Sequence, residues 1–176
     1  EYLSKINKKK TFMLMYGDKF SVISYTTHIN PKNIYKKISK SLLTQYLKTL
    51  FNLEINQCYG IDFNKIYFLC YSPHCSEKGT LGNEDIRILS VTSKFKEIID
   101  LIPADSLYKY LNNKTLFISC YHDQGLIPFK ILNDNKGINI TLGLNYRRLS
   151  PAHGTAKDIK FKNKANINSY IKCMKI

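Results

Sequence analysis

Histidine is the residue type in this sequence best suited to bind a metal ion. Three of its four histidines, His28, His74 and His122, come within a few residues of the end of an apolar run that is typical of a strand. The carboxyl ends of the strands in an α/β sheet border the ligand crevice. Three imidazoles there can hold a divalent ion and leave one coordination position open, as catalytic sites do. Taken singly, each histidine is better explained as an ordinary surface or core residue.

Residues 121–125, Tyr-His-Asp-Gln-Gly, place polar groups between apolar flanks. A buried strand seldom ends in such groups unless they meet a metal or a substrate. Lys130, Asn139 and Arg148 follow at equal steps of nine, and Lys and Arg are natural partners of a phosphate. From the spacing alone, Lys130 and Arg148 are better explained as solvated surface charges.

Another segment, His153-Gly154-Thr155-Ala156, contains small side chains, so its backbone could approach a ligand closely. The sequence contains no G-x-G-x-x-G and no G-x-x-x-x-G-K segment, so neither common nucleotide-binding loop is present.

Apolar periodicity predicts alternating strands and helices to position these residues. We expect strands at 11–16, 20–26, 65–71, 116–121 and 137–144, and helices at 31–51, 83–99 and 166–175. The strands are almost entirely apolar, which indicates an α/β sheet covered on both faces.

The formal net charge of +14 raises a nucleic-acid-binding module as an alternative from another class. The basic residues are 24 lysines and only three arginines, and the lysines are spread along the chain. Base recognition favours arginine, so we expect no nucleic-acid partner.

The apolar runs are far shorter than the roughly 20 residues of a membrane span, so no membrane association is expected. Five cysteines form an odd set without a C-x-x-C pair, which predicts reduced thiols and a cytoplasmic location. The chain opens on Glu1 rather than methionine, and we expect it to be a piece of a longer protein.

Several segments together resemble the 4-hydroxythreonine-4-phosphate dehydrogenases. The segments are TTH (26–28), SPHCSEKGTLGNED (72–85), PADSLY (103–108), YHDQGLIPFK (121–130), INITLGL (138–144) and RRLSPAHGTAKDI (147–159). The resemblance implies the three-layer α/β/α fold of the isocitrate and isopropylmalate dehydrogenases, with this chain as the carboxyl-terminal half of a two-domain subunit. It also implies NAD-dependent oxidation of 4-phosphooxy-L-threonine, followed by decarboxylation to 3-amino-2-oxopropyl phosphate.

The same resemblance implies a role for individual residues. His28, His74 and His122 would hold a divalent metal in a homodimer with a shared active site, His122 coming from the partner subunit. The implied substrate contacts are Lys130, Asn139 and Arg148. Asp105 and Asp123 would be the acidic catalytic residues. His153, Gly154 and Asp158 would contact NAD. Zinc, cobalt and magnesium are not distinguished, although imidazoles suit zinc or another transition ion better than magnesium. Residues 1–144 would form the metal- and substrate-binding domain, and 145–176 an NAD loop and a tail that returns to an amino-terminal domain.

The sequence also departs from the family pattern. Ser76 and Lys78 stand where the family motif N-P-H-A-G-E-G-G has glycine, and Leu149 and Ala152 replace a threonine and an aspartate. These departures keep two alternatives open: a related dehydrogenase for another phosphorylated hydroxy acid, and a degenerate, non-catalytic remnant.

Overall fold

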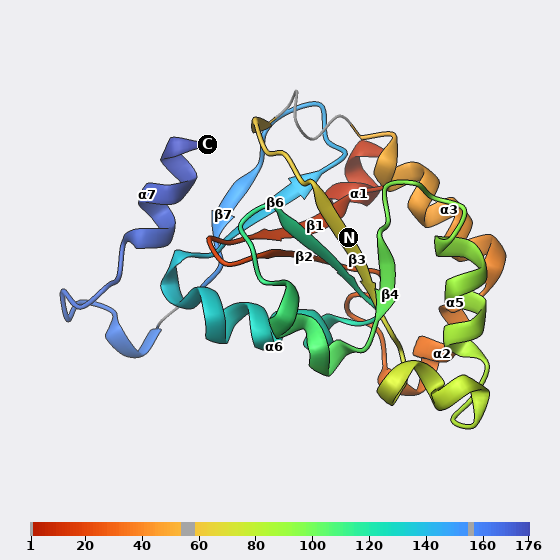
Figure 1. Ribbon diagram of the computed structural model, residues 1–176. Coiled ribbons are helices and arrows are strands. Elements are labelled where there is room, and N and C mark those ends of the chain that lie inside the picture. The colour runs from red at the N-terminus through yellow and green to blue at the C-terminus, as the bar shows by residue number, and fades with distance from the viewer. Residues whose placement is uncertain (1, 54–58, 155–156) are drawn as a thin grey trace.

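A seven-stranded mixed sheet forms the centre of the molecule in the computed structural model, which describes residues 2–53, 59–154 and 157–176 (Figure 1). The strand order is β4-β3-β5-β2-β1-β6-β7. The bounds are β1 (Phe12–Tyr16), β2 (Ser21–Ser24), β3 (Lys65–Leu69), β4 (Asp100–Ile102), β5 (Thr115–Ser119), β6 (Ile138–Leu142) and β7 (Leu149–Pro151).

Half of the sheet is parallel and half is antiparallel. Strands β2, β5, β3 and β4 pair in parallel, whereas β1 is antiparallel to β2 and β6, and β6 is antiparallel to β7. The carboxyl ends of β2, β5 and β3 therefore lie side by side at one edge of the sheet.

Successive strand residues point to opposite faces of the sheet, so each strand contributes side chains to a hydrophobic core on either face. Leu14, Ile23 and Phe68 belong to one buried cluster, which includes residues of α3 (Lys40–Phe51) and α5 (Glu84–Thr92). Their neighbours in the sequence, such as Met15 and Val22, belong to a second cluster with residues of α6 (His122–Asn133). The predicted three-layer α/β/α arrangement is confirmed (Figure 1).

The helix predicted at 31–51 is divided into three pieces. These are the 3-10 helix η1 (Pro31–Asn33), α2 (Ile34–Lys37) and α3. The break falls at Ile38, which leaves helical geometry with φ −83° and ψ 70°. Ser39 then caps α3 by accepting a hydrogen bond from the backbone N–H of Leu42, and this polar cap explains the restart.

Other expected boundaries also differ. Helix α5 ends at Thr92, well before the predicted end at 99. Several elements were not predicted from the sequence. They are α1 (Tyr2–Asn7), β4, α6, β7 and the 3-10 helices η2 (Pro73–Gly79), η3 (Ala104–Tyr110), η4 (Asp134–Lys136) and η5 (Lys157–Ile159).

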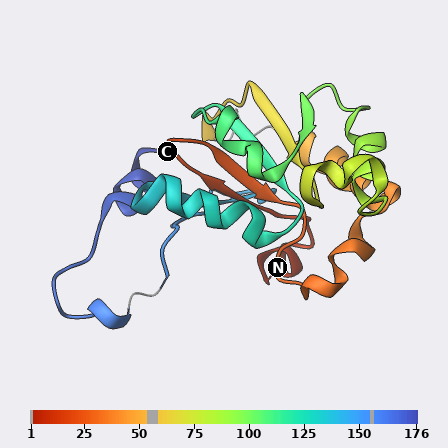
Figure 2. The same cartoon turned by 60° about the horizontal axis from the view of Figure 1, so that its bottom comes forward.

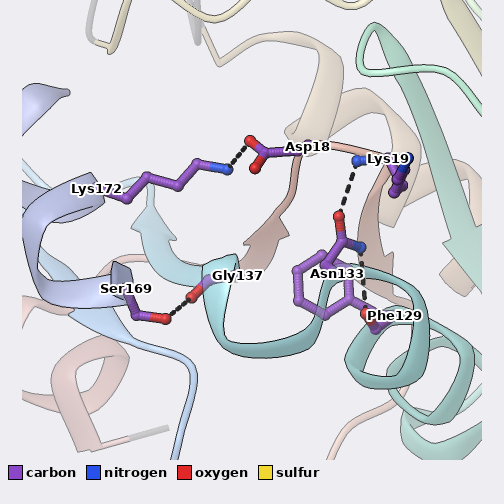
Figure 3. Close-up of polar contacts among 7 residues, drawn as sticks. All are labelled: Asp18, Lys19, Phe129, Asn133, Gly137, Ser169 and Lys172. Atoms are coloured by element: carbon purple, nitrogen blue, oxygen red, sulfur yellow. Dashed lines mark hydrogen bonds and ion pairs between the residues drawn. The ribbon is translucent and has the colours of Figure 1, made fainter. Parts of the chain in front are cut away.

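The carboxyl-terminal helix α7 (Asn168–Lys175) packs near β6 and β7, after a segment that extends away from the sheet (Figure 2). The buried Ser169 hydroxyl donates to the carbonyl oxygen of Gly137 at 2.7 Å, and the Lys172 ammonium lies 2.5 Å from a carboxylate oxygen of Asp18 (Figure 3). The tail is thus attached to this domain. The division at residue 144 and the return to an amino-terminal domain stay predictions.

The prediction that every cysteine is a reduced thiol is wrong for one pair. Cys70 and Cys75 form a disulfide with Cα atoms 5.2 Å apart, because the chain turns back in η2 directly after β3. Cys120 and Cys173 carry free thiols, and Cys58 lies outside the described residues. Within the described ranges, none of the helices is both long and apolar enough to cross a bilayer.

Candidate active site

Three histidines follow three adjacent parallel strands. His28 comes after β2, His122 opens α6 directly after β5, and His74 lies in η2 after β3. The ring centroids of His28 and His122 are 5.6 Å apart within the one chain. The sequence-based expectation that these strand ends lie together is therefore confirmed for His28 and His122.

A line of hydrogen bonds joins the ends of the three strands. Thr26, after β2, donates through its hydroxyl to the carbonyl oxygen of Cys120 at 2.8 Å. The Gln124 side chain accepts from the backbone N–H of Cys120 at 2.8 Å and donates to the carbonyl oxygen of Cys70 at 2.6 Å. These bonds link β2 to β5 and β5 to β3, so they fix the separation of the segments that carry the histidines.

The candidate acids occupy different positions at this edge. The Asp123 carboxylate lies 2.7 Å from Nδ1 of His122, a contact that orients the ring and leaves Nε2 available. Asp105 is exposed on η3, which lies against the segment η2 that carries His74. The catalytic roles of both residues stay predictions.

The donor set fits a divalent metal in part. Two neighbouring imidazoles, one of them oriented by a carboxylate, suit a transition ion. Among the residues that the structure describes, no three His, Cys, Asp or Glu side chains are gathered around one point, so His74 does not join the pair. His122 lies beside His28 of its own chain. That His122 comes from the partner subunit in a shared metal site stays a prediction.

A cavity of about 300 Å³ lies beside His28, and His122 is not among the described residues that line it. His28, Thr27, Asn139, Thr141 and Arg148 are among the residues that line it. The structure thus brings two of the three predicted substrate contacts together. Lys130 lies exposed on α6 and is not among the described residues that line the cavity.

Two side chains of this cavity are fixed in different ways. The Arg148 guanidinium donates to the hydroxyl of Thr141 at 3.2 Å, which holds it on β6. The amide oxygen of Asn139 is buried, and it has no hydrogen-bond partner among the described residues. A buried acceptor without a partner costs free energy. It is therefore a natural place for a ligand hydroxyl or ammonium to donate.

The predicted NAD segment lies in an exposed part of the chain. His153 and Gly154 are both exposed, and Nδ1 of His153 lies 2.9 Å from the Gly154 carbonyl oxygen. Thr155 and Ala156 of the same motif lie outside the described residues. Asp158 falls in η5. The assignment of these residues to NAD stays a prediction.

Two nearby groups that could bind a metal as anions, the Cys120 thiol and the Tyr25 phenol, are kept protonated by burial. Burial raises the pKa of the Cys120 thiol, which donates to the Leu69 carbonyl oxygen at 3.2 Å. Burial, with a smaller contribution from Cys120, raises the pKa of Tyr25 to about 12. Both groups are neutral near pH 7, so they support the strand ends rather than bind a cation.

The whole chain, residues 1–176, matches the family model described as pyridoxal phosphate biosynthetic protein PdxA. The chain belongs to the PdxA family. A 4-hydroxythreonine-4-phosphate dehydrogenase of Hydrogenobaculum sp. (strain Y04AAS1) is 37% identical over 170 residues, which are 96% of this chain and 54% of that relative. The enzyme of the same name from Aquifex aeolicus (strain VF5) is 35% identical over 182 residues, covering 100% of this chain and 56% of the relative.

Solved structures of PdxA-family proteins give the same result. The 4-hydroxythreonine-4-phosphate dehydrogenase of Klebsiella pneumoniae superposes with a TM-score of 0.73 at 26% identity, over 98% of this chain and 56% of that one. The corresponding protein of Burkholderia phymatum gives a TM-score of 0.72 at 27% identity, over 98% and 54%. This chain thus spans about half the length of the PdxA proteins that it matches.

Proposed function

We propose that this chain supplies the metal- and phosphate-binding half of an NAD-dependent 4-hydroxythreonine-4-phosphate dehydrogenase. The complete protein would oxidise 4-phosphooxy-L-threonine and release carbon dioxide to give 3-amino-2-oxopropyl phosphate. The family match and the names of the relatives support the reaction. The observation that carries it to this chain is the His28–His122 pair, with His28 beside a cavity that Asn139 and Arg148 also line.

The residues of this site have separable tasks. Arg148 presents a fixed guanidinium, which suits a phosphate because it offers several charged hydrogen-bond donors. The unpartnered amide oxygen of Asn139 would accept a hydrogen bond from a substrate hydroxyl or ammonium. His28 and His122, with His74 as the proposed third ligand, would hold the metal, and His153, Gly154 and Asp158 would contact NAD. A bound divalent metal lowers the pKa of a coordinated hydroxyl and stabilises negative charge on a carbonyl oxygen.

The test is a steady-state assay of the complete protein with NAD and 4-phosphooxy-L-threonine, in wild type and in Arg148→Ala. A hydrogen bond to a charged group contributes about 1.5–3 kcal/mol, so the variant is expected to raise KM by about tenfold to a hundredfold. Arg147→Ala is the matched control. Arg147 is the neighbouring arginine and is exposed, and its guanidinium donates to the Ile176 carbonyl oxygen instead.

Three outcomes would contradict the proposal. Turnover of a different phosphorylated hydroxy acid in preference to 4-phosphooxy-L-threonine would favour a related dehydrogenase. An equal rise in KM in both arginine variants would remove Arg148 from the substrate site. A folded complete protein that turns over none of these substrates would be the degenerate remnant.

A further inference from the structure

The segment that follows β3 is closed by a covalent bond. Cys70 comes directly after β3, Cys75 lies in η2, and the two form a disulfide with Cα atoms 5.2 Å apart. Four residues, 71–74, lie between the two cysteines. A disulfide limits the conformations that are open to the chain between its ends. This short segment is therefore constrained covalently as well as by packing.

The backbone around Cys75 has a conformation that favours glycine. Residues 74–78 all adopt positive φ, from 45° to 61°, and none of them is glycine. This region is unfavourable for residues with a Cβ atom and persists only where surrounding contacts impose it. The family motif has glycine at the positions of Ser76 and Lys78, and alanine at the position of Cys75. The chain thus lacks two glycines and has a covalent closure that alanine cannot form.

Hydrogen bonds hold other points of the same loop. The buried Asp85 carboxylate accepts from the backbone N–H groups of Tyr71 and Ser72, at 2.6 and 3.0 Å. It also accepts from the Ser76 hydroxyl at 2.6 Å. None of the described hydrogen bonds of Asp85 runs to Cys75. The disulfide fastens the loop at a point that the carboxylate does not reach.

The two ends of the disulfide differ in their access to solvent. Cys70 is only 1% exposed, whereas Cys75 is partly exposed. Exchange requires that a thiolate reach one of the two sulfur atoms, and exposed disulfides are reduced more readily than buried structural ones. A reductant therefore reaches Cys75 and not Cys70.

A third cysteine near the bond is unsuited to exchange with it. Cys120 comes directly after β5, which pairs with β3, and its thiol donates to the Leu69 carbonyl oxygen at 3.2 Å. Cys120 is fully buried, and burial raises its pKa. Because the thiolate is the species that attacks a disulfide, Cys120 stays a thiol beside the bond. The pairing of Cys70 with Cys75 is thus protected from rearrangement.

The disulfide lies at the edge of the sheet where the candidate site is found. The carbonyl oxygen of Cys70 accepts a hydrogen bond from the Gln124 side chain at 2.6 Å. Gln124 belongs to the first turn of α6, the helix that begins with His122. A change in the segment around Cys70 therefore occurs next to the strand ends that carry the site.

We propose that the Cys70–Cys75 disulfide is a redox site, reduced by a dithiol, whose state determines the conformation of the η2 loop. One thiolate of the dithiol attacks Sγ of Cys75, the S–S bond breaks, and Cys70 leaves as a thiolate that takes up a proton. The second thiolate of the dithiol then attacks the mixed disulfide and releases Cys75, which is protonated in turn. The dithiol ends as a disulfide and the protein as a pair of thiols. This inference does not depend on the proposed function, because the predicted change is in the loop.

The experiment compares amide hydrogen exchange in the oxidised complete protein and in the protein reduced by dithiothreitol without denaturant. The backbone N–H of Leu81 donates to the Ser76 carbonyl oxygen at 3.2 Å, and that of Thr80 donates to the Glu77 carbonyl oxygen at 3.5 Å. Reduction is expected to speed exchange at both amides about tenfold or more, because local opening of the loop controls their exchange. Strand β5 is expected to keep its protection, which shows that the protein stays folded.

Reduced thioredoxin, a dithiol protein, is run beside dithiothreitol. Faster reduction by thioredoxin assigns the reductant to a protein, and faster reduction by dithiothreitol assigns it to a free dithiol. Peptide mapping after alkylation identifies the cysteines that are released.

Cysteine variants separate the two ends of the bond. Cys75→Ala is expected to exchange like the reduced wild type and to be insensitive to dithiothreitol. With oxidised glutathione, Cys75 in the Cys70→Ser variant is expected to form a mixed disulfide about tenfold or more faster than the buried Cys70 in Cys75→Ser. Cys173→Ser is the matched control. Cys173 carries a free, partly exposed thiol outside the loop, so this variant should respond to dithiothreitol as the wild type does.

Any one of three results would overturn the proposal. The first is a disulfide that resists both dithiols until the protein is denatured. The second is equal exchange at Thr80 and Leu81 in the oxidised and reduced proteins. The third is glutathione addition that is as fast at Cys70 as at Cys75. The first two results come from the wild-type protein, so the test stands even where a variant fails to fold.

Discussion

At the residue scale, the chain departs from its family where backbone geometry is most demanding. Ser76 and Lys78 stand where the family motif has glycine. The structure places both residues at φ 61°, so the loop keeps a conformation that favours glycine. The partner of the Ser76 hydroxyl was not predictable, because it is the Asp85 carboxylate, which lies on α5.

Lys78 offers a direct measure of this local strain. A left-handed conformation destabilises a residue with a Cβ atom by about 1–2 kcal/mol. Glycine relieves this strain, but its greater loss of backbone entropy on folding offsets about 0.5–1 kcal/mol of the gain. Lys78→Gly is therefore expected to raise the free energy of unfolding by roughly 0.5–1 kcal/mol, as measured by urea denaturation. Lys94→Gly is the control. Lys94 is another exposed lysine, and it is absent from the described positive-φ residues, so its replacement should lower stability.

At the element scale, apolar strands were easier to predict than the helix that covers them. Strands were predicted at 116–121 and 137–144, which are runs of β-branched and apolar residues. Strands β5 and β6 begin within one residue of these ranges and end two residues earlier. Helix α6 was missed because Gly125 and Pro128 disfavour a helix in isolation. Tertiary packing overrides that tendency: Gly125 is buried, and Leu126 and Phe129 of the same helix pack on the sheet.

Gly125 allows α6 to approach the strands that carry the site. A Cβ atom at this position would lie 2.6 Å from the Ser119 hydroxyl oxygen and 2.6 Å from a methyl group of Val22. Gly125→Ala is expected to lower the free energy of unfolding by about 1–3 kcal/mol through overpacking, although alanine normally favours a helix. Urea denaturation measures the change. Gly154→Ala, where a Cβ meets nothing within 4 Å, should leave stability nearly unchanged, and equal losses in both variants would contradict the packing argument.

At the scale of the whole molecule, the sequence was sufficient for the three-layer architecture and for the edge of the sheet where the site lies. Alternation of apolar strands with helices predicts the layers, and strand ends predict the edge. The Cys70–Cys75 disulfide and the cavity next to His28 depend on how distant segments pack, and spacing along the chain does not encode that. The exposed position of Lys130 on α6, outside the described lining of the cavity that includes Arg148, was likewise not predictable from the sequence.

The central claim is that His28 and His122 bind one divalent cation in the complete protein. Elemental analysis after dialysis, for wild type, His28→Ala, His122→Ala and His153→Ala, tests it most directly. The account predicts a stoichiometric transition metal in wild type and in His153→Ala, whose ring is exposed and remote in the sequence, and loss of the metal in the other two variants. Retention of the full metal content by His122→Ala, or a wild-type protein that binds no metal, would contradict it.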